Sequence, residues 1–218
     1  MDWTPITVRQ FDDLLLEEPS AAAGVSRAIV ERLPFVFESK RQYLTWRDTL
    51  AQQLEVDGRD LAIVGSAATG RSLNPRKRFK TFDAESDIDI AVVSSHHFDQ
   101  AWRWFLETDP LIITGLDQVG KEKFAAHRSH YIYEGVIAAE YFLSYLPFGR
   151  GWAAALQRNQ ALLPARAQGR FIRVRIYRDN RALRDAQRLA VETYLRVLRN
   201  RRDNQAAATN ENLDGSKK

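Results

Sequence analysis

The chain has 218 residues, of which 44% are hydrophobic and 11% aromatic, so it can bury the core of one domain. It contains no cysteine, which excludes a disulfide framework and a zinc site built on thiolates. The formal net charge is +4, but residues 166–202 hold twelve arginines against three acidic residues. This clustering is typical of a protein with a polyanionic partner such as RNA or a nucleoside triphosphate, although a solvated helix face in an Arg-rich protein has the same composition.

The N-terminal sequence has no basic region followed by an apolar stretch, which is the pattern of a secretory signal. The longest apolar stretch, at 135–143, is interrupted by Glu140 and is too short to span a bilayer. We therefore expect a cytoplasmic protein with no membrane partner.

The N-terminal part of the chain is expected to be helical. The segment 8–16 is short and amphipathic, and the segment 20–33 begins at Ser20, which is a favourable N-cap residue. A third helix begins near Ser39. Its apolar residues recur with helical spacing, which predicts that one side faces the core. These residues are Tyr43, Trp46, Leu50 and Leu54.

Two short strands are predicted next. The apolar run 61–64, ended by Gly65, is typical of a buried strand, and Ser86 begins a second strand in which acidic residues alternate with isoleucines. Because successive side chains of a strand point to opposite faces, Asp87 and Asp89 share one face. Adjacent acids repel each other, and a divalent cation such as Mg²⁺, which prefers hard oxygen ligands, removes that repulsion. The pair is therefore a candidate metal site.

The turn GSAATG and the strand SDIDIAVV together resemble the nucleotidyltransferase superfamily typified by DNA polymerase β. The resemblance implies an α+β fold, in which a small mixed β-sheet is flanked by helices and further helices lie at the N- and C-terminal ends. It also implies that the turn at Gly65–Ser66 leads into a helix whose N-terminus cradles the triphosphate of an NTP. In this family the two alternating acids, here Asp87 and Asp89, hold Mg²⁺, or Mn²⁺ in its place, at the α-phosphate and are catalytic.

The residues after the turn are further candidates for nucleotide binding. The hydroxyl of Ser66 can bond a phosphate oxygen together with exposed backbone N–H groups, and Thr69 either joins it or caps the helix. Gly70 permits close approach of the backbone to a ligand. The segment 71–85 is longer than in compact members of the family and carries Arg71 with four other basic residues. Two interpretations stay open, a loop that grips phosphates or an acceptor strand, and an ordinary mobile insertion.

Beyond the second strand, the sequence predicts helices over 98–108 and 152–163. Between them we expect a short strand over 111–114 and a buried helix or helix–strand mixture over 131–146. The pair His96–His97 is placed in a loop, with solvated side chains favoured over a metal role.

The segment 171–177 alternates again and is predicted to be a third central strand. In the family this strand often bears a third carboxylate, but here the corresponding face shows Arg173 and Arg175, which are candidates to bind the triphosphate. Asp179, just beyond the strand, is the substitute catalytic carboxylate, although capping of the next helix is the favoured role for it. The other candidates are Glu134 and Glu140.

A long amphipathic helix is predicted over 180–202, and the polar residues after it are expected to be disordered. The chain is thus expected to form one nucleotidyltransferase domain over 1–203, with a disordered tail over 204–218. The domain includes the N-terminal helical segment and the basic C-terminal helix.

The expected activity is transfer of an NMP from an NTP to a hydroxyl acceptor. RNA, and tRNA in particular, is the favoured acceptor, and a protein side chain or a second nucleotide are the alternatives. A second hypothesis is a catalytically inactive module that binds nucleotide or RNA and regulates a partner, and a third is a plain RNA-binding helical protein. By analogy at the level of the fold, the domain is similar to nucleotidyltransferases of toxin–antitoxin and phage-defence systems, which adds a cognate antitoxin or defence protein to the expected partners.

Overall fold

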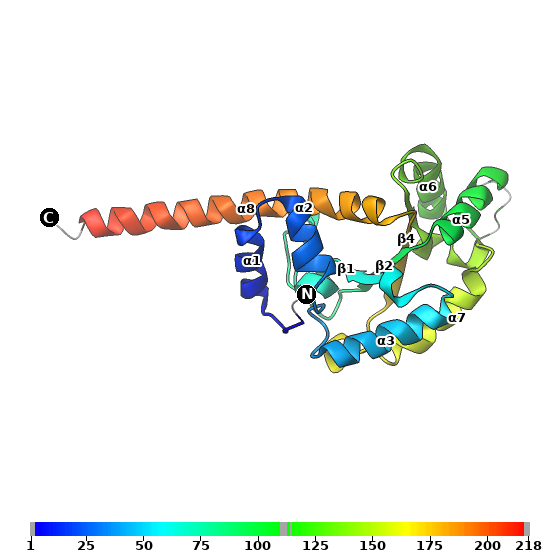
Figure 1. Ribbon diagram of the computed structural model, residues 1–218. Coiled ribbons are helices and arrows are strands. Elements are labelled where there is room, and N and C mark those ends of the chain that lie inside the picture. Colours follow the sequence, from blue (N-terminus) through cyan, green and yellow to red (C-terminus); the bar gives the residue numbers. More distant parts are fainter. Residues whose placement is uncertain (1–2, 110–112, 114, 216–218) are drawn as a thin grey trace.

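The structure, a computed structural model, describes residues 3–109, 113 and 115–215, with side chains as far as Asn204. Its centre is a four-stranded mixed sheet surrounded by helices (Figure 1). The strand order is β1-β2-β4-β3, where β1 is antiparallel to β2, β2 is parallel to β4, and β3 is antiparallel to β4. The strands are β1 (Leu61–Val64), β2 (Ile88–Val93), β3 (Val136–Ala138) and β4 (Ile172–Tyr177). The predicted α+β class with a small mixed sheet is thereby confirmed.

Capping residues begin the N-terminal helices where the sequence predicts them. The side chains of Thr7, Ser20 and Ser39 each accept a backbone N–H from the first turn of the helix that follows. The segment that follows Ser20 continues in π-helical form and ends three residues earlier than predicted. These elements are α1 (Val8–Glu17), α2 (Ala21–Gly24), η1 (Val25–Val30) and α3 (Lys40–Gln53).

The remaining elements connect and cover the strands. The longer helices are α5 (Ser95–Glu107), α6 (Gln118–Ala126), α7 (Gly149–Gln160) and α8 (Asn180–Gly215), and α4 (Ser66–Thr69) is a single turn. The short helical segments are η2 (Gly58–Asp60), η3 (Pro75–Lys77), η4 (His127–Tyr131), η5 (Ala139–Tyr141), η6 (Leu143–Tyr145) and η7 (Ala165–Ala167). The segment 131–146 is thus a helix–strand mixture, one of the two predicted forms. The strand predicted over 111–114 lies, apart from Ile113, outside the described residues.

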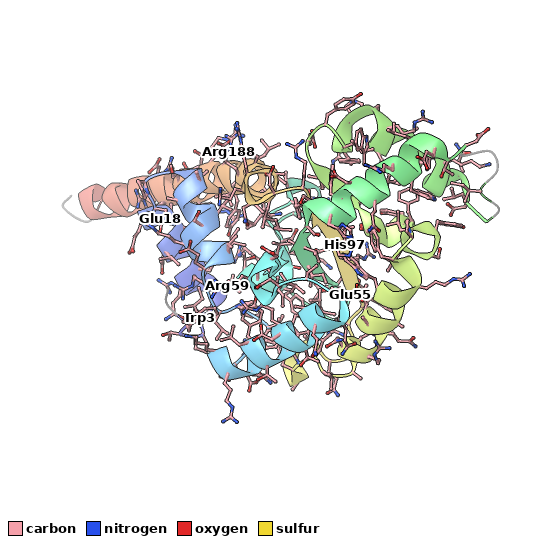
Figure 2. The ribbon with its side chains drawn as sticks, turned by 45° about the vertical axis from the view of Figure 1, so that its right-hand side comes forward. Trp3, Glu18, Glu55, Arg59, His97 and Arg188 are labelled. Carbon is pink, nitrogen blue, oxygen red and sulfur yellow. The ribbon has the colours of Figure 1, made fainter. Side chains whose placement is uncertain are left out.

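The two histidines expected in a loop belong instead to the first turn of α5. Ser94 caps this helix, because its hydroxyl oxygen accepts the backbone N–H of His97, so the helix begins three residues before Phe98. His97 is buried against the rings of Phe148 and Trp152, on the same side of the molecule as Glu55 (Figure 2). A solvated role for this histidine is therefore wrong.

The two faces of the sheet have different environments. Ile88, Ile90 and Val92 of β2 point into the main hydrophobic core, together with buried residues of α3, α5 and α7. The opposite face carries Asp89 and Ala91 and packs in part against the first turns of α8, where a second, smaller apolar cluster forms. The period-two pattern of the sequence thus placed the isoleucines in the core and Asp89 on the face that meets α8.

The C-terminal helix is the longest element of the fold. Its apolar side, which includes Leu183, Val191, Tyr194 and Leu198, is buried, and Figure 1 shows its C-terminal part projecting past α1. α8 has 36 residues and continues to Gly215, through most of the segment predicted as a disordered tail, which contains three consecutive alanines that favour helix. Although α8 is long, neither it nor any other helix in the described part of the chain is apolar enough to cross a membrane.

Candidate active site

The turn after β1 and the second acid of β2 lie against each other. Val64, the last residue of β1, pairs with Asp89 in the antiparallel register, so the next residue, Gly65, passes beside the Asp89 carboxylate. The backbone of Gly65 has φ 65° and ψ −152°, a conformation that is essentially restricted to glycine. A Cβ at this position would stand 2.9 Å from Oδ2 of Asp89. The glycine is therefore required both by the backbone and by the closeness of the carboxylate.

A cavity of about 220 Å³ opens beside this turn. It is bounded by η1, the end of β1, the loop after α4, β2, β4 and one side of α8, so segments from most of the chain meet there. Its polar lining consists of Gly65, Ser66, Ser72, Asn74, Lys77, Asp89, Arg175 and Gln187. We call it the Asp89 cavity. It unites the predicted turn, one predicted metal acid and one predicted arginine with Asn74 and Lys77 of the basic segment 71–85. Gln187, which also lines it, carries no signal in the sequence that points to a site.

The charges around Asp89 are mostly positive. Burial raises the pKa of the Asp89 carboxyl, while Arg175, Lys77 and Arg173 act in the opposite direction and Asp87 adds to the increase. The net result is an acid held in a low-dielectric site by nearby cations. Perturbed carboxyls of this kind are concentrated at functional sites.

Asp87 makes an ion pair with β4. Because β2 and β4 are parallel and Asp89 lies opposite Arg173, the neighbouring Asp87 reaches the Nε of Arg173 at 2.9 Å. The Asp87 side chain is 22% exposed and that of Arg173 is 47% exposed. Arg173 thus lies among the acids of the site, and its contact in this structure is Asp87.

Glu140 lies near Asp89 and Arg175. One of its oxygens, Oε2, is buried and has no hydrogen-bond partner among the described residues. Burial raises its pKa; Arg175 lowers it and Asp89 raises it further, so these charges are near neighbours. Its place follows from the strand register, because Glu140 comes two residues after Ala138, the β3 residue that pairs with Arg175. Glu134, the other alternative, instead lines a second cavity.

Asp179 is not brought to this site. It caps α8, where its Oδ1 accepts the backbone N–H of Ala182 at 2.8 Å, and this hydrogen bond lowers its pKa. It follows the C-terminal end of β4, whereas Asp89 lies opposite Arg173 near the beginning of that strand. The span from Arg173 to Tyr177 alone is about 13 Å. The structure therefore gives Asp179 the capping role that the sequence favoured.

Two other predicted ligand residues lie behind the turn. The buried hydroxyl of Thr69 donates to the carbonyl oxygen of Arg71 at 2.6 Å and to that of Gly65 at 3.2 Å. The guanidinium of Arg71 is 3.4 Å from Oδ2 of Asp12 and lies over the ring of Tyr194. Both side chains thus stabilise the turn and its contact with α1 and α8 in this structure.

The carboxylates of the site fit a hard divalent cation in their chemistry. The strand predicted to begin at Ser86 begins at Ile88, so Asp89 supplies its carboxylate oxygens from β2 and Asp87 supplies its own from the residue just before β2. Glu140 supplies a buried oxygen that lacks a partner among the described residues. Within the described residues, however, no three or more His, Asp or Glu side chains are grouped closely enough to hold a metal ion together. A cation would therefore require Asp87 to exchange Arg173 for it.

Comparison with known proteins adds no assignment to this geometry. No protein-family model matches the chain, and searches of curated proteins and of solved structures give no match. The function is therefore argued from the arrangement of the site itself.

Proposed function

We propose that the protein is a Mg²⁺-dependent nucleotidyltransferase with a polymerase β-like fold, and that it moves an NMP from an NTP to a hydroxyl acceptor. The observation that carries the proposal is the contact between the Gly65 turn and Asp89 inside a cavity that also contains Lys77 and Arg175. A phosphate-binding turn, a carboxylate and two cations are the groups that a nucleoside triphosphate requires.

The triphosphate would be held mainly by the turn and the cations. Because α4 is a single helical turn, its macrodipole contributes less than that of a long helix. The backbone N–H groups at the start of α4, the Ser66 hydroxyl and the Lys77 ammonium can bond the β- and γ-phosphates. Arg175, on β4, would bond the α-phosphate beside Asp89.

Asp87 and Asp89 would hold the cation, which offsets the negative charge that develops on the α-phosphate and on the leaving group. Glu140, whose pKa is raised by burial, is suited to accept the proton of the attacking hydroxyl. The acceptor oxygen then forms a bond to the α-phosphorus, the bond to the bridging oxygen breaks, and pyrophosphate leaves with the electron pair. Asp87 can leave Arg173 for the cation at little cost in free energy, because a partly exposed ion pair contributes only about 0–1 kcal/mol.

The test is incorporation of label from each of the four NTPs into RNA or protein in the presence of Mg²⁺. We expect the single substitutions Asp87→Asn and Asp89→Asn to reduce incorporation at least about 100-fold, as loss of a group that stabilises transition-state charge does. Asp99→Asn, which changes an exposed aspartate on α5, is the matched control and should retain full incorporation. Incorporation that persists in Asp89→Asn would contradict the proposal.

One observation favours a second function, a catalytically inactive module that binds nucleotide or RNA and regulates a partner. Arg173 and Arg175 take the place of a carboxylate on β4, and Arg173 engages Asp87. This function predicts nucleotide binding without transfer to RNA, protein or a second nucleotide. It also predicts that Asp87→Asn leaves nucleotide binding intact.

A further inference from the structure

A second, larger cavity adjoins the Asp89 cavity. Its volume is about 580 Å³, and it shares Arg175, Ala186 and Gln187 with the smaller cavity. The two cavities lie side by side across the sheet, whose strand order is β1-β2-β4-β3. The smaller is lined by Gly65 after β1, Asp89 of β2 and Arg175 of β4, and the larger by Arg175 and by Val136 of β3. A ligand in the larger cavity would thus share Arg175 with a ligand bound beside Asp89.

The lining of this cavity combines aromatic side chains with arginines and acids. Tyr133 is 81% exposed and Leu189 is 67% exposed, which is unusual for large apolar side chains beside a cavity. Tyr131 adds a second aromatic ring. Two arginines also line the cavity, Arg178 just before α8 and Arg181 in its first turn. We call it the tyrosine cavity. Its size is within the range of pockets that take small molecules or a single base with its sugar.

The acids of the tyrosine cavity do not exclude a phosphate backbone. Three acids, Glu134, Asp179 and Asp185, line the cavity with three arginines, and Glu134 is exposed. Arg178 is 3.4 Å from Asp179, and Arg181 is 3.6 Å from Asp185. The four side chains of these two ion pairs are about half exposed or more, and exposed pairs of this kind are weak. The arginines can therefore exchange these partners for phosphates, with which they make stronger, charge-assisted contacts.

We propose that the tyrosine cavity binds the terminal base of a single-stranded polynucleotide, whose end hydroxyl is the acceptor in the reaction proposed above. An exposed aromatic ring flanked by arginines is the usual platform for single-stranded nucleic acid, because every base can stack on it. Further exposed arginines, Arg184 and Arg188, follow Arg181 on α8, and Figure 2 shows Arg188 on this helix. A strand needs such cations beyond the cavity, whereas the base of a mononucleotide does not.

The experiment is a fluorescence anisotropy titration with labelled RNA and DNA strands of about 12 nucleotides, without NTP. Tyr133→Ala should weaken binding about tenfold, because stacking of one base is lost, and Tyr133→Trp should restore it. Trp102→Ala, which removes a partly exposed aromatic ring on α5, is the control and should bind as the parent protein does. The strand that binds with the higher affinity, RNA or DNA, identifies the type of polynucleotide that the cavity prefers.

Three results would overturn the inference. One is equal binding by the parent protein and Tyr133→Ala, and another is competition between a saturating NTP and the strand, which would assign the cavity to the NTP base. The third is Asp89-dependent labelling of protein with no strand binding, which leaves the transferase proposal standing and removes only this inference. Conversely, Tyr133-dependent strand binding without nucleotidyl transfer supports the tyrosine cavity and removes the transferase proposal.

Discussion

Asp89 and Glu140 are charged groups in a partly dehydrated site, and their environment has a cost for the fold. Burial is the largest cause of the raised pKa in both, and the arginines of β4 compensate only in part. A carboxyl whose pKa is higher in the folded chain destabilises the fold when it is ionised in both states. Such a cost is typical of groups kept for function and not for stability.

Removing either charge should therefore stabilise the protein at neutral pH. We expect Asp89→Asn and Glu140→Gln to raise the Tm at pH 7. In a chain of this length, each kcal/mol gained in the free energy of unfolding raises the Tm by about 2–4 °C. The gain should shrink as the pH falls through the raised pKa and vanish below the ordinary value, 3.8 for Asp89 and 4.5 for Glu140, because both states are then protonated. Calorimetry across this pH range measures it, with Asp99→Asn as the control. A lower Tm at pH 7 would mean that the cations stabilise the acids more than burial destabilises them.

At the scale of the element, the turn between β1 and α4 depends on Gly65. We expect Gly65→Ala to destabilise the chain by about 1–3 kcal/mol, since the backbone conformation is strained for any other residue. It should also abolish binding of an NTP, because the added methyl group displaces the Asp89 carboxylate. Urea unfolding and nucleotide titration check the two effects. Gly151→Ala on α7 is the control: a Cβ there has no neighbour within 4 Å, so the variant should be as stable or slightly more stable. An unchanged nucleotide affinity in Gly65→Ala would show that the turn does not bind phosphates.

The elements themselves were predictable where a pattern is local. Period-two alternation predicted which side of β2 is buried, and the caps Ser20 and Ser39 predicted two helix starts. Strand partners are set by long-range packing instead, so the sequence could not show that Arg173 would lie opposite Asp89 in a parallel pair. For the same reason, Arg71 appeared to be a phosphate ligand, because its partner Asp12 is 59 positions away in the sequence.

For the whole molecule, α8 links the N-terminal helices to the proposed catalytic face. It contacts α1 and α2 as well as β2 and β4, and the hydroxyl of Tyr194 donates to Oδ1 of Asp12 at 2.8 Å. Its last buried residue among those with described side chains is Leu198, and positions 199–204 are exposed. The helix therefore fixes a basic segment at a set distance from the tyrosine cavity, about 27 Å from Arg181 to Arg199 along its axis.

A strand whose end occupies the tyrosine cavity would pass along this helix. We expect the triple substitution of Arg199, Arg201 and Arg202 by Gln to leave the Tm unchanged, since all three side chains are exposed. If each contacts one phosphate, the slope of log affinity against log salt concentration should become shallower by about 2 for a strand of about 30 nucleotides. The matched control replaces the exposed Arg41, Arg103 and Arg150, which lie on α3, α5 and α7, and lowers the net charge equally. If both triple variants change the slope to the same extent, the effect is one of net charge alone, and if neither does, the strand does not follow α8.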